Sequence, residues 1–122
     1  MPFQYVLANL LAEDPDTIGV LFLDDAGETI DLVCAEYSPF EMRIAGAYLG
    51  IYLRRMGEIL ESSELGTTRE FHIERERLHF HVTALPDGYF LALVQRSPAV
   101  VARARERLQH AAAELKRVVF ET

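Results

Sequence analysis

The stretch from residue 17 to residue 35, TIGVLFLDDAGETIDLVCA, decides how this sequence folds. Its first half, Thr17–Asp24, is apolar at almost every position, whereas in Glu28–Ala35 apolar and polar residues partly alternate. A short turn containing Asp25 and Gly27 joins the two halves, and such a pattern predicts a β-hairpin. A strand that is apolar on both faces belongs in the middle of a sheet whose two faces are covered. Thr17–Asp24 is therefore predicted to be a central strand.

Three further strands are predicted towards the C-terminus. Gly88–Arg96 is apolar on both faces and is expected beside Thr17–Asp24 in the centre of the sheet. Leu78–Leu85 precedes it across a Pro-Asp-Gly turn. Arg69–Arg75 is short and charged, which is typical of an edge strand, and Glu28–Ala35 is expected at the opposite edge.

Three amphipathic segments predict helices around these strands. Residues 3–13 have apolar side chains at helical spacing and stop before a proline. Ser38–Ser62 opens with Ser38, a proline and Glu41, which together predict a capping box. The third helix starts at Ser97-Pro98 and runs to the C-terminus. The order αββαβββα predicts one α/β domain (an α+β sandwich) over residues 1–122. Its five-stranded antiparallel sheet has the order 2-1-5-4-3, with the central helix on one face and the terminal helices on the other.

Composition narrows the class of protein. The 122 residues include 12 Lys and Arg against 19 Asp and Glu, a net charge of −7 that argues against a nucleic-acid partner. No apolar run approaches the roughly 20 residues that a membrane-spanning helix needs, so no membrane insertion is expected. The lone Cys34 fits a reducing cytoplasm and is expected to be a buried core residue. The last 25 residues hold five basic and three acidic residues, which is expected to be a solvated helix face.

The sequence offers few groups for catalysis. His79 and His81 share one face of a strand, a spacing that can bind metal, but the simpler interpretation is the polar face of an outer strand. Nothing in the sequence requires His72, on the neighbouring strand, to face them. Asp24 and Asp25 are expected to bond the amides of their turn. We therefore predict no catalytic residue, no cofactor and no metal.

The central helix carries the most informative pattern. One face is a normal sheet-packing stripe, made of Met42, Ala45, Leu49, Leu53, Met56 and Leu60. The opposite face is apolar in its N-terminal half, with Phe40, Ile44, Ala47, Tyr48 and Ile51, and charged in its C-terminal half, with Arg54, Arg55, Glu58 and Glu61. A helix that is apolar all round needs a second burial surface. A second chain is one such surface, and the loop after Ala35 or the end of another helix is the alternative. Gly46 and Gly50 would permit another element to approach closely.

The strand Arg69–Arg75 leaves two possibilities open. Opposite charges near its two ends suggest complementarity in an antiparallel self-pairing, which would extend the sheet across a two-fold axis and bring Phe71 and Ile73 into an interface. The alternative is an edge that its charges merely protect.

Two segments together with the element order resemble the roadblock/dynein light chain family. Thr17–Ile30 is similar to that family's opening strand, its glycine-containing turn and its return strand. Asp87–Arg96 is similar to its last strand, and the Ala45-Gly46-Ala47 cluster lies where the family has its dimer helix.

The resemblance implies a cytoplasmic, non-catalytic interaction module that forms dimers and works with a small Ras-like GTPase. The homodimer interface would contain Phe40, Ile44, Ala47, Tyr48, Ile51, Phe71 and Ile73. The residues expected to bind the GTPase are Arg54, Arg55 and Glu58.

Two other functions remain open from the sequence. One is a small-molecule sensor with a PAS-like fold, which would have an apolar cavity beside Tyr89 and Phe80. The other, a more distant alternative, is a metal-dependent enzyme built on His79 and His81.

Overall fold

The structure, a computed structural model, describes residues 3–60, 63–97 and 100–121. Its helices and strands are α1 (Gln4–Ala12), β1 (Thr17–Leu23), β2 (Thr29–Cys34), α2 (Pro39–Leu60), β3 (Glu70–Glu74), β4 (Leu78–Ala84), β5 (Phe90–Arg96) and α3 (Val101–Leu115). A 3₁₀ turn, Pro86–Gly88, precedes β5, and a π-helical turn, Lys116–Phe120, continues α3. Among the residues described, no helix combines the length and the apolar character needed to cross a membrane.

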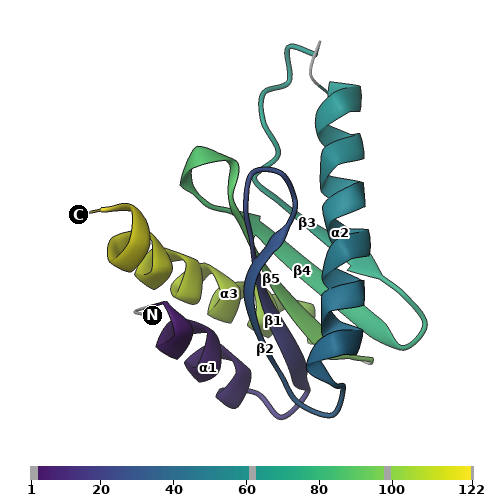
Figure 1. Ribbon diagram of the computed structural model, residues 1–122, viewed down its shortest axis with the longest axis vertical. Coiled ribbons are helices and arrows are strands. Elements are labelled where there is room, and N and C mark those ends of the chain that lie inside the picture. The colour runs from purple at the N-terminus through teal and green to yellow at the C-terminus, as the bar shows by residue number, and fades with distance from the viewer. Residues whose placement is uncertain (1–2, 61–62, 98–99, 122) are drawn as a thin grey trace.

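The five strands form one antiparallel sheet in the order β2-β1-β5-β4-β3, which confirms the predicted topology (Figure 1). The long helix α2 covers one face alone, while α1 and α3 lie side by side on the other. Every residue of β1 is buried, as expected for a central strand.

A separate hydrophobic core lies on each face of the sheet. On the α1 and α3 side, Phe22 packs among side chains that include Leu7, Leu10 and Leu108. On the α2 side, Leu21 belongs to a cluster that includes Met42, Leu49 and Leu53, three residues of the predicted packing stripe. The helix α2 begins at the predicted capping box: the Glu41 amide donates to Ser38 Oγ and the Ser38 amide donates to Glu41 Oε1, both at 3.1 Å.

The turn between β1 and β2 lies directly against α2. A Cβ atom added to Gly50 would lie 2.0 Å from the carbonyl oxygen of Gly27. Gly27 has a φ of +80°, a conformation that favours glycine. Arg54 Nη1 donates a hydrogen bond of 2.8 Å to the Ala26 carbonyl beside it. The element that approaches this part of α2 is therefore the chain's own hairpin.

The basic residues of α3 do not form a merely solvated face, which corrects the sequence prediction. Asp14, after α1, is only 2% exposed, and its Oδ2 lies 2.8 Å from Arg107 Nη1 and 3.4 Å from Arg103 Nε. Arg105 pairs with Glu70 of β3. A buried carboxylate needs such partners because an unpaired buried charge is costly. These arginines tie α3 to α1 and to the sheet.

Two other details differ from the sequence prediction, and two further predictions concern residues that the structure does not describe. α3 begins at Val101 rather than at Ser97, because the Ser97 amide still donates to the Arg77 carbonyl and Val100 remains extended. The predicted capping proline, Pro98, and the predicted end of the central helix at Ser62 lie outside the described residues. Cys34 is partly exposed on the edge strand β2, not fully buried in the core.

We predict that Gly50→Ala destabilises the fold by about 1–3 kcal/mol, because its methyl group would collide with the Gly27 backbone. Gly57→Ala is the matched control: a Cβ there meets nothing within 4 Å, so helix propensity should raise the free energy of unfolding by up to about 1 kcal/mol. Urea denaturation of both variants measures the difference. Equal effects of the two substitutions would contradict the close contact.

Asp14→Ala should lower the free energy of unfolding by roughly 2–3 kcal/mol, because it leaves two arginines and the Asp16 amide without their carboxylate. Asp16→Ala serves as the control, since Asp16 pairs with Arg96 at 3.7 Å where both side chains are nearly half exposed. Exposed pairs contribute at most about 1 kcal/mol. Thermal unfolding followed by circular dichroism compares the two, and similar losses would rule out the special role of Asp14.

Candidate functional site

The outer face of α2 exposes several large apolar side chains. Phe40 is 64% exposed and Tyr48 is 63% exposed. The face consists of Phe40, Ile44, Ala47, Tyr48, Ile51 and Tyr52, all of them exposed. Sequence analysis missed Tyr52, although it lies four residues after Tyr48 and so one turn further along the same side.

No described part of the chain covers this outer face. The helices α1 and α3 lie on the far side of the sheet (Figure 1). The loop after β2 is itself exposed at Ala35 and Tyr37. Single exposed apolar side chains are common, but a contiguous row of them marks an interaction surface. The alternative of a covering loop or helix within the described chain is therefore wrong.

A groove of about 370 Å³ connects the outer face of α2 to the outer strands. Tyr48 and Tyr52 form its helix side, while Ile73 and Phe80 form its sheet side. Phe71 and Ile73 of β3 are half buried and pack against the core under α2. The predicted interface residues of α2 and β3 thus lie on the same side of the sheet, and one from each element, Tyr48 and Ile73, lines this groove.

The sensor alternative required one apolar cavity beside Tyr89 and Phe80. The structure places these two rings on opposite faces of the sheet. Tyr89 packs with Phe22 and Phe120, at ring-centroid distances of 5.9 and 5.4 Å, whereas Phe80 belongs to the core under α2. No cavity can therefore lie beside both rings.

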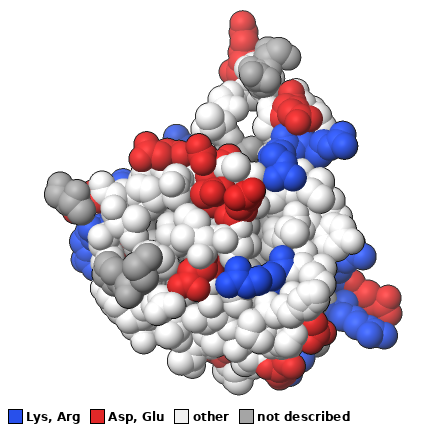
Figure 2. Space-filling model, viewed as in Figure 1, with Lys and Arg blue, Asp and Glu red and all other residues white. Residues whose placement is uncertain are grey.

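The three residues predicted to bind a partner divide into two groups. Arg54 and Glu58 line an open groove of about 940 Å³ at the C-terminal end of α2, which we call the end groove. Arg55 is not among its lining residues; it follows Ile51 by four positions and so continues the outer face of α2. Figure 2 shows charged side chains grouped at the upper end of α2.

Acidic side chains of two turns also line the end groove. Asp24 and Asp25 come from the β1–β2 turn, and Asp87 comes from the turn before β5. Asp24 Oδ1 accepts 2.9 Å hydrogen bonds from the amides of Ala26 and Glu28, which confirms its predicted role in the turn. The end groove therefore combines an apolar lining, which includes Leu53 and Phe90, with charged side chains that are acidic except for Arg54.

The histidines of β3 and β4 form a cluster under the α1 and α3 side of the sheet. His79 and His81, which the sequence assigned to the polar face of an outer strand, are only 6% and 4% exposed and so lie buried. His72 faces them, because it pairs directly with His81 across the two strands. The His72 and His81 rings stack at 4.6 Å with an interplanar angle of 2°.

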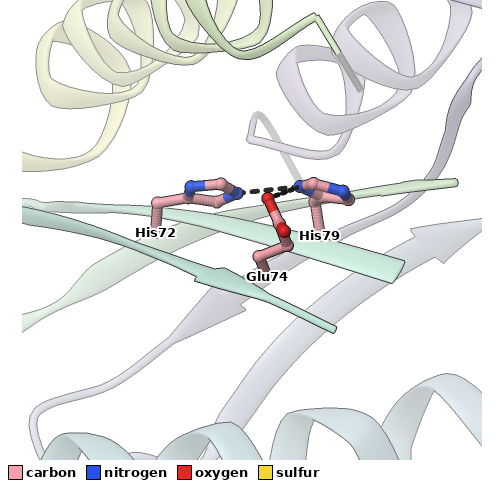
Figure 3. A group of neighbouring side chains, drawn as sticks. All are labelled: His72, Glu74 and His79. Atoms are coloured by element: carbon pink, nitrogen blue, oxygen red, sulfur yellow. Dashed lines mark hydrogen bonds and ion pairs between the residues drawn. The ribbon is translucent and has the colours of Figure 1, made fainter. Parts of the chain in front are cut away.

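Hydrogen bonds define two ends of this histidine cluster. At the inner end, His81 Nε2 lies 3.2 Å from Gln95 Oε1 on β5. At the outer end, His72 Nε2 lies 2.9 Å from His79 Nδ1, and Glu74 Oε1 lies 3.9 Å from the same His79 atom (Figure 3). Sequence analysis missed His72 and Glu74 as members of one group. The register of the β3–β4 hairpin could have revealed this group, because it places Glu74 opposite His79.

Burial is the main cause of the pKa shifts of His72 and His81. Burial, together with smaller effects of the neighbouring rings of His72 and His79, lowers the pKa of His81 to about 4, against the opposing effect of the hydrogen bond to Gln95. Burial also lowers the pKa of His72, with a further reduction from His79 and an opposing effect from Glu74. Both rings are therefore neutral near pH 7, the form in which imidazole binds metals.

Comparison with known proteins gives matches in structure only. No protein-family model matches the sequence, and no curated protein matches it. A Roadblock/LC7 domain from Streptomyces avermitilis has a TM-score of 0.77 at 16% identity, over 95% of this chain and 96% of that one. The gliding protein MglB from Thermus thermophilus has a TM-score of 0.82 at 17% identity, over 99% and 90% of the two chains. A structure of MglB in a tetrameric arrangement has a TM-score of 0.82 at 18% identity, over 98% and 88%. The chain therefore has the Roadblock/LC7 fold.

Proposed function

We propose that this chain is a bacterial roadblock-family protein, a single domain over residues 1–122, that pairs with a second copy of itself. In that form it acts as a non-catalytic, cytoplasmic adaptor or regulator of a small Ras-like GTPase. The observation that carries the proposal is the uncovered outer face of α2. Similarity to the Roadblock/LC7 domain and to MglB supports it over nearly the whole chain. The tetrameric arrangement of an MglB structure supports self-association.

The first element of the proposed interface is the outer face of α2. Exposed aromatic rings such as Phe40 and Tyr48 bury large areas when they are covered, and burial contributes about 25 cal/mol per Å² of apolar surface. Two α2 helices packed side by side about a two-fold axis would cover each other's outer face, because the same surface serves both copies. Ile44, Ala47 and Ile51 lie at the spacing that such a helix pair requires.

The second element is the edge strand β3, which pairs with its copy so that the two sheets become one. In an antiparallel pair, residues directly opposite each other point to the same face of the sheet. The two-fold axis must therefore pass through a pair of identical residues, one from each copy of β3. With His72 on the axis, Glu70 would lie opposite the partner's Glu74, and Arg69 opposite the partner's Arg75. The charge complementarity expected from the sequence therefore fails in that register. With Ile73 on the axis, His72 lies opposite the partner's Glu74, and this is the register we favour.

In-chain pairing also reduces the charge that β3 presents at its edge. Glu70 accepts from Arg105 and, at 2.8 Å, from Gln109 of α3. An edge strand with one of its charges paired within the chain opposes association less than the sequence alone suggests. This supports the pairing alternative for β3 over the protected-edge alternative.

The proposed binding surface for the GTPase is the end groove, where α2 contributes Arg54 and Glu58. The lining of this groove combines apolar side chains with several charged ones, and charged groups at an interface favour selective association. Arg54 also holds the β1–β2 turn through the Ala26 carbonyl, so it has a structural role besides any contact with a partner. The resemblance to the roadblock family supplies the class of partner, a small Ras-like GTPase.

Placing a charge on the outer face of α2 should dissociate the dimer. We expect the wild-type protein to sediment as a dimer at micromolar concentration and both Ile51→Asp and Ile44→Asp to sediment as monomers, because a buried unpaired carboxylate is very costly. Tyr5→Asp, on the exposed side of α1, is the control and should remain dimeric. A monomeric wild type would refute the dimer, and two dimeric α2 variants would move the interface elsewhere.

Reversing one charge in the end groove should weaken binding to the GTPase. We expect Glu58→Lys to reduce affinity for a Ras-like GTPase from the same genome by roughly tenfold, or about 1.4 kcal/mol. Glu106→Lys is the matched control, since Glu106 is exposed on α3, across the sheet from α2 and outside the groove. Pull-down and titration use the GTPase loaded with GTP and with GDP. Equal losses in both variants would reflect net charge alone and would remove the end groove from the proposal.

A further inference from the structure

The outer end of the histidine cluster brings three possible metal ligands together. His72 Nε2, His79 Nδ1 and one carboxylate oxygen of Glu74 all lie within 4.8 Å of one another. In Figure 3, the His72 ring and the Glu74 carboxylate both point towards His79. From this geometry we propose that these three side chains bind one divalent transition-metal ion, with Zn²⁺ as the best-fitting ion.

The distances are close to those that a bound zinc ion imposes. Zinc bonds nitrogen and carboxylate oxygen at about 2.0–2.2 Å in tetrahedral sites, so its ligand atoms stand about 3.3 Å apart. The separations from His79 Nδ1 are 2.9 Å to His72 Nε2 and 3.9 Å to Glu74 Oε1, which bracket that value. Small rotations of two side chains would therefore form the site.

The surroundings combine one fixed ligand with two adjustable ones. The side chain of His79 is 8% exposed, whereas that of Glu74 is 73% exposed and His72 is also exposed. Glu74 and His72 can therefore close on an ion that arrives from solvent, while the position of His79 stays fixed. His81 is not a ligand in this arrangement, because its Nε2 lies against Gln95. A water molecule completes the four-coordinate shell.

The donor set selects the class of metal. Two imidazole nitrogens and one carboxylate oxygen suit Zn²⁺ and its transition-metal neighbours, whereas Mg²⁺ and Ca²⁺ prefer oxygen ligands alone. In the bound state the ion takes the place of the hydrogen bond between the His72 and His79 rings, and the ring that donated it carries its proton on its other nitrogen. It also links the edge strand β3 to β4 through side chains. This inference needs neither the proposed dimer nor its GTPase.

Calorimetric titration with ZnCl₂ tests the site directly, on full-length protein that carries no polyhistidine tag and has been treated with a chelator. We expect one zinc ion per chain with micromolar or tighter affinity, and no binding of Mg²⁺ under the same conditions. His72→Gln and Glu74→Gln should each weaken zinc binding by at least about tenfold. His110→Gln, which removes an exposed histidine of α3 outside the cluster, should bind zinc like the wild type.

Thermal unfolding supplies the second measurement. Because zinc binds only the folded chain at this site, it should raise the melting temperature of the wild type and of His110→Gln, but hardly that of the two ligand variants. Glu74→Gln changes an exposed side chain and should keep its fold, which circular dichroism verifies. Failure of the wild type to bind zinc at micromolar concentration would overturn the proposal. So would unchanged affinity in both ligand variants, loss of affinity in His110→Gln, or equal binding of Mg²⁺.

Discussion

A sheet that is apolar on both faces is the constraint on which the rest of this structure depends. Strand β1 is buried at every position, and β5 and β4 are buried along most of their lengths. Such strands need a layer of helix on each side. Within the part of the chain that the structure describes, two helices cover one face and α2 alone covers the other. The single helix therefore has to cover one whole face of the sheet, and its opposite side remains uncovered.

The composition of α2 follows from this position. Towards the sheet it presents large apolar residues where it meets strands, and glycine at position 50 where it meets the Gly27 backbone of the β1–β2 turn. Away from the sheet it presents aromatic and branched apolar side chains that have no contact to satisfy within the described chain. The proposed dimer would account for both sides of α2, because the helix would pack on its own sheet with one side and on its copy with the other.

The face under α1 and α3 shows a different way to bury polar groups. Towards the outer strands its apolar core gives way to Gln95, His81 and His79, all buried. Gln95 links His81 to the buried carboxylate of Asp14, with contacts of 3.2 and 3.4 Å, and arginines of α3 neutralise that carboxylate. Each buried polar side chain in this series has a partner, which offsets the cost of removing it from water. The proposed zinc site lies where this series reaches solvent.

The sequence alone determined the element order, the strand order, the capping box at the start of α2 and the apolar outer face of that helix. These features depend on local periodicity and on short-range capping, and both can be recognised from residues that are close in the sequence. Only the tertiary structure decided which distant side chains meet. The pairing of Asp14 with Arg103 and Arg107, the separation of Tyr89 from Phe80, and the meeting of His72 with His79 depend on strand register and on the docking of α3. A shift of one residue in register reverses the face of every side chain, so no local pattern fixes such contacts.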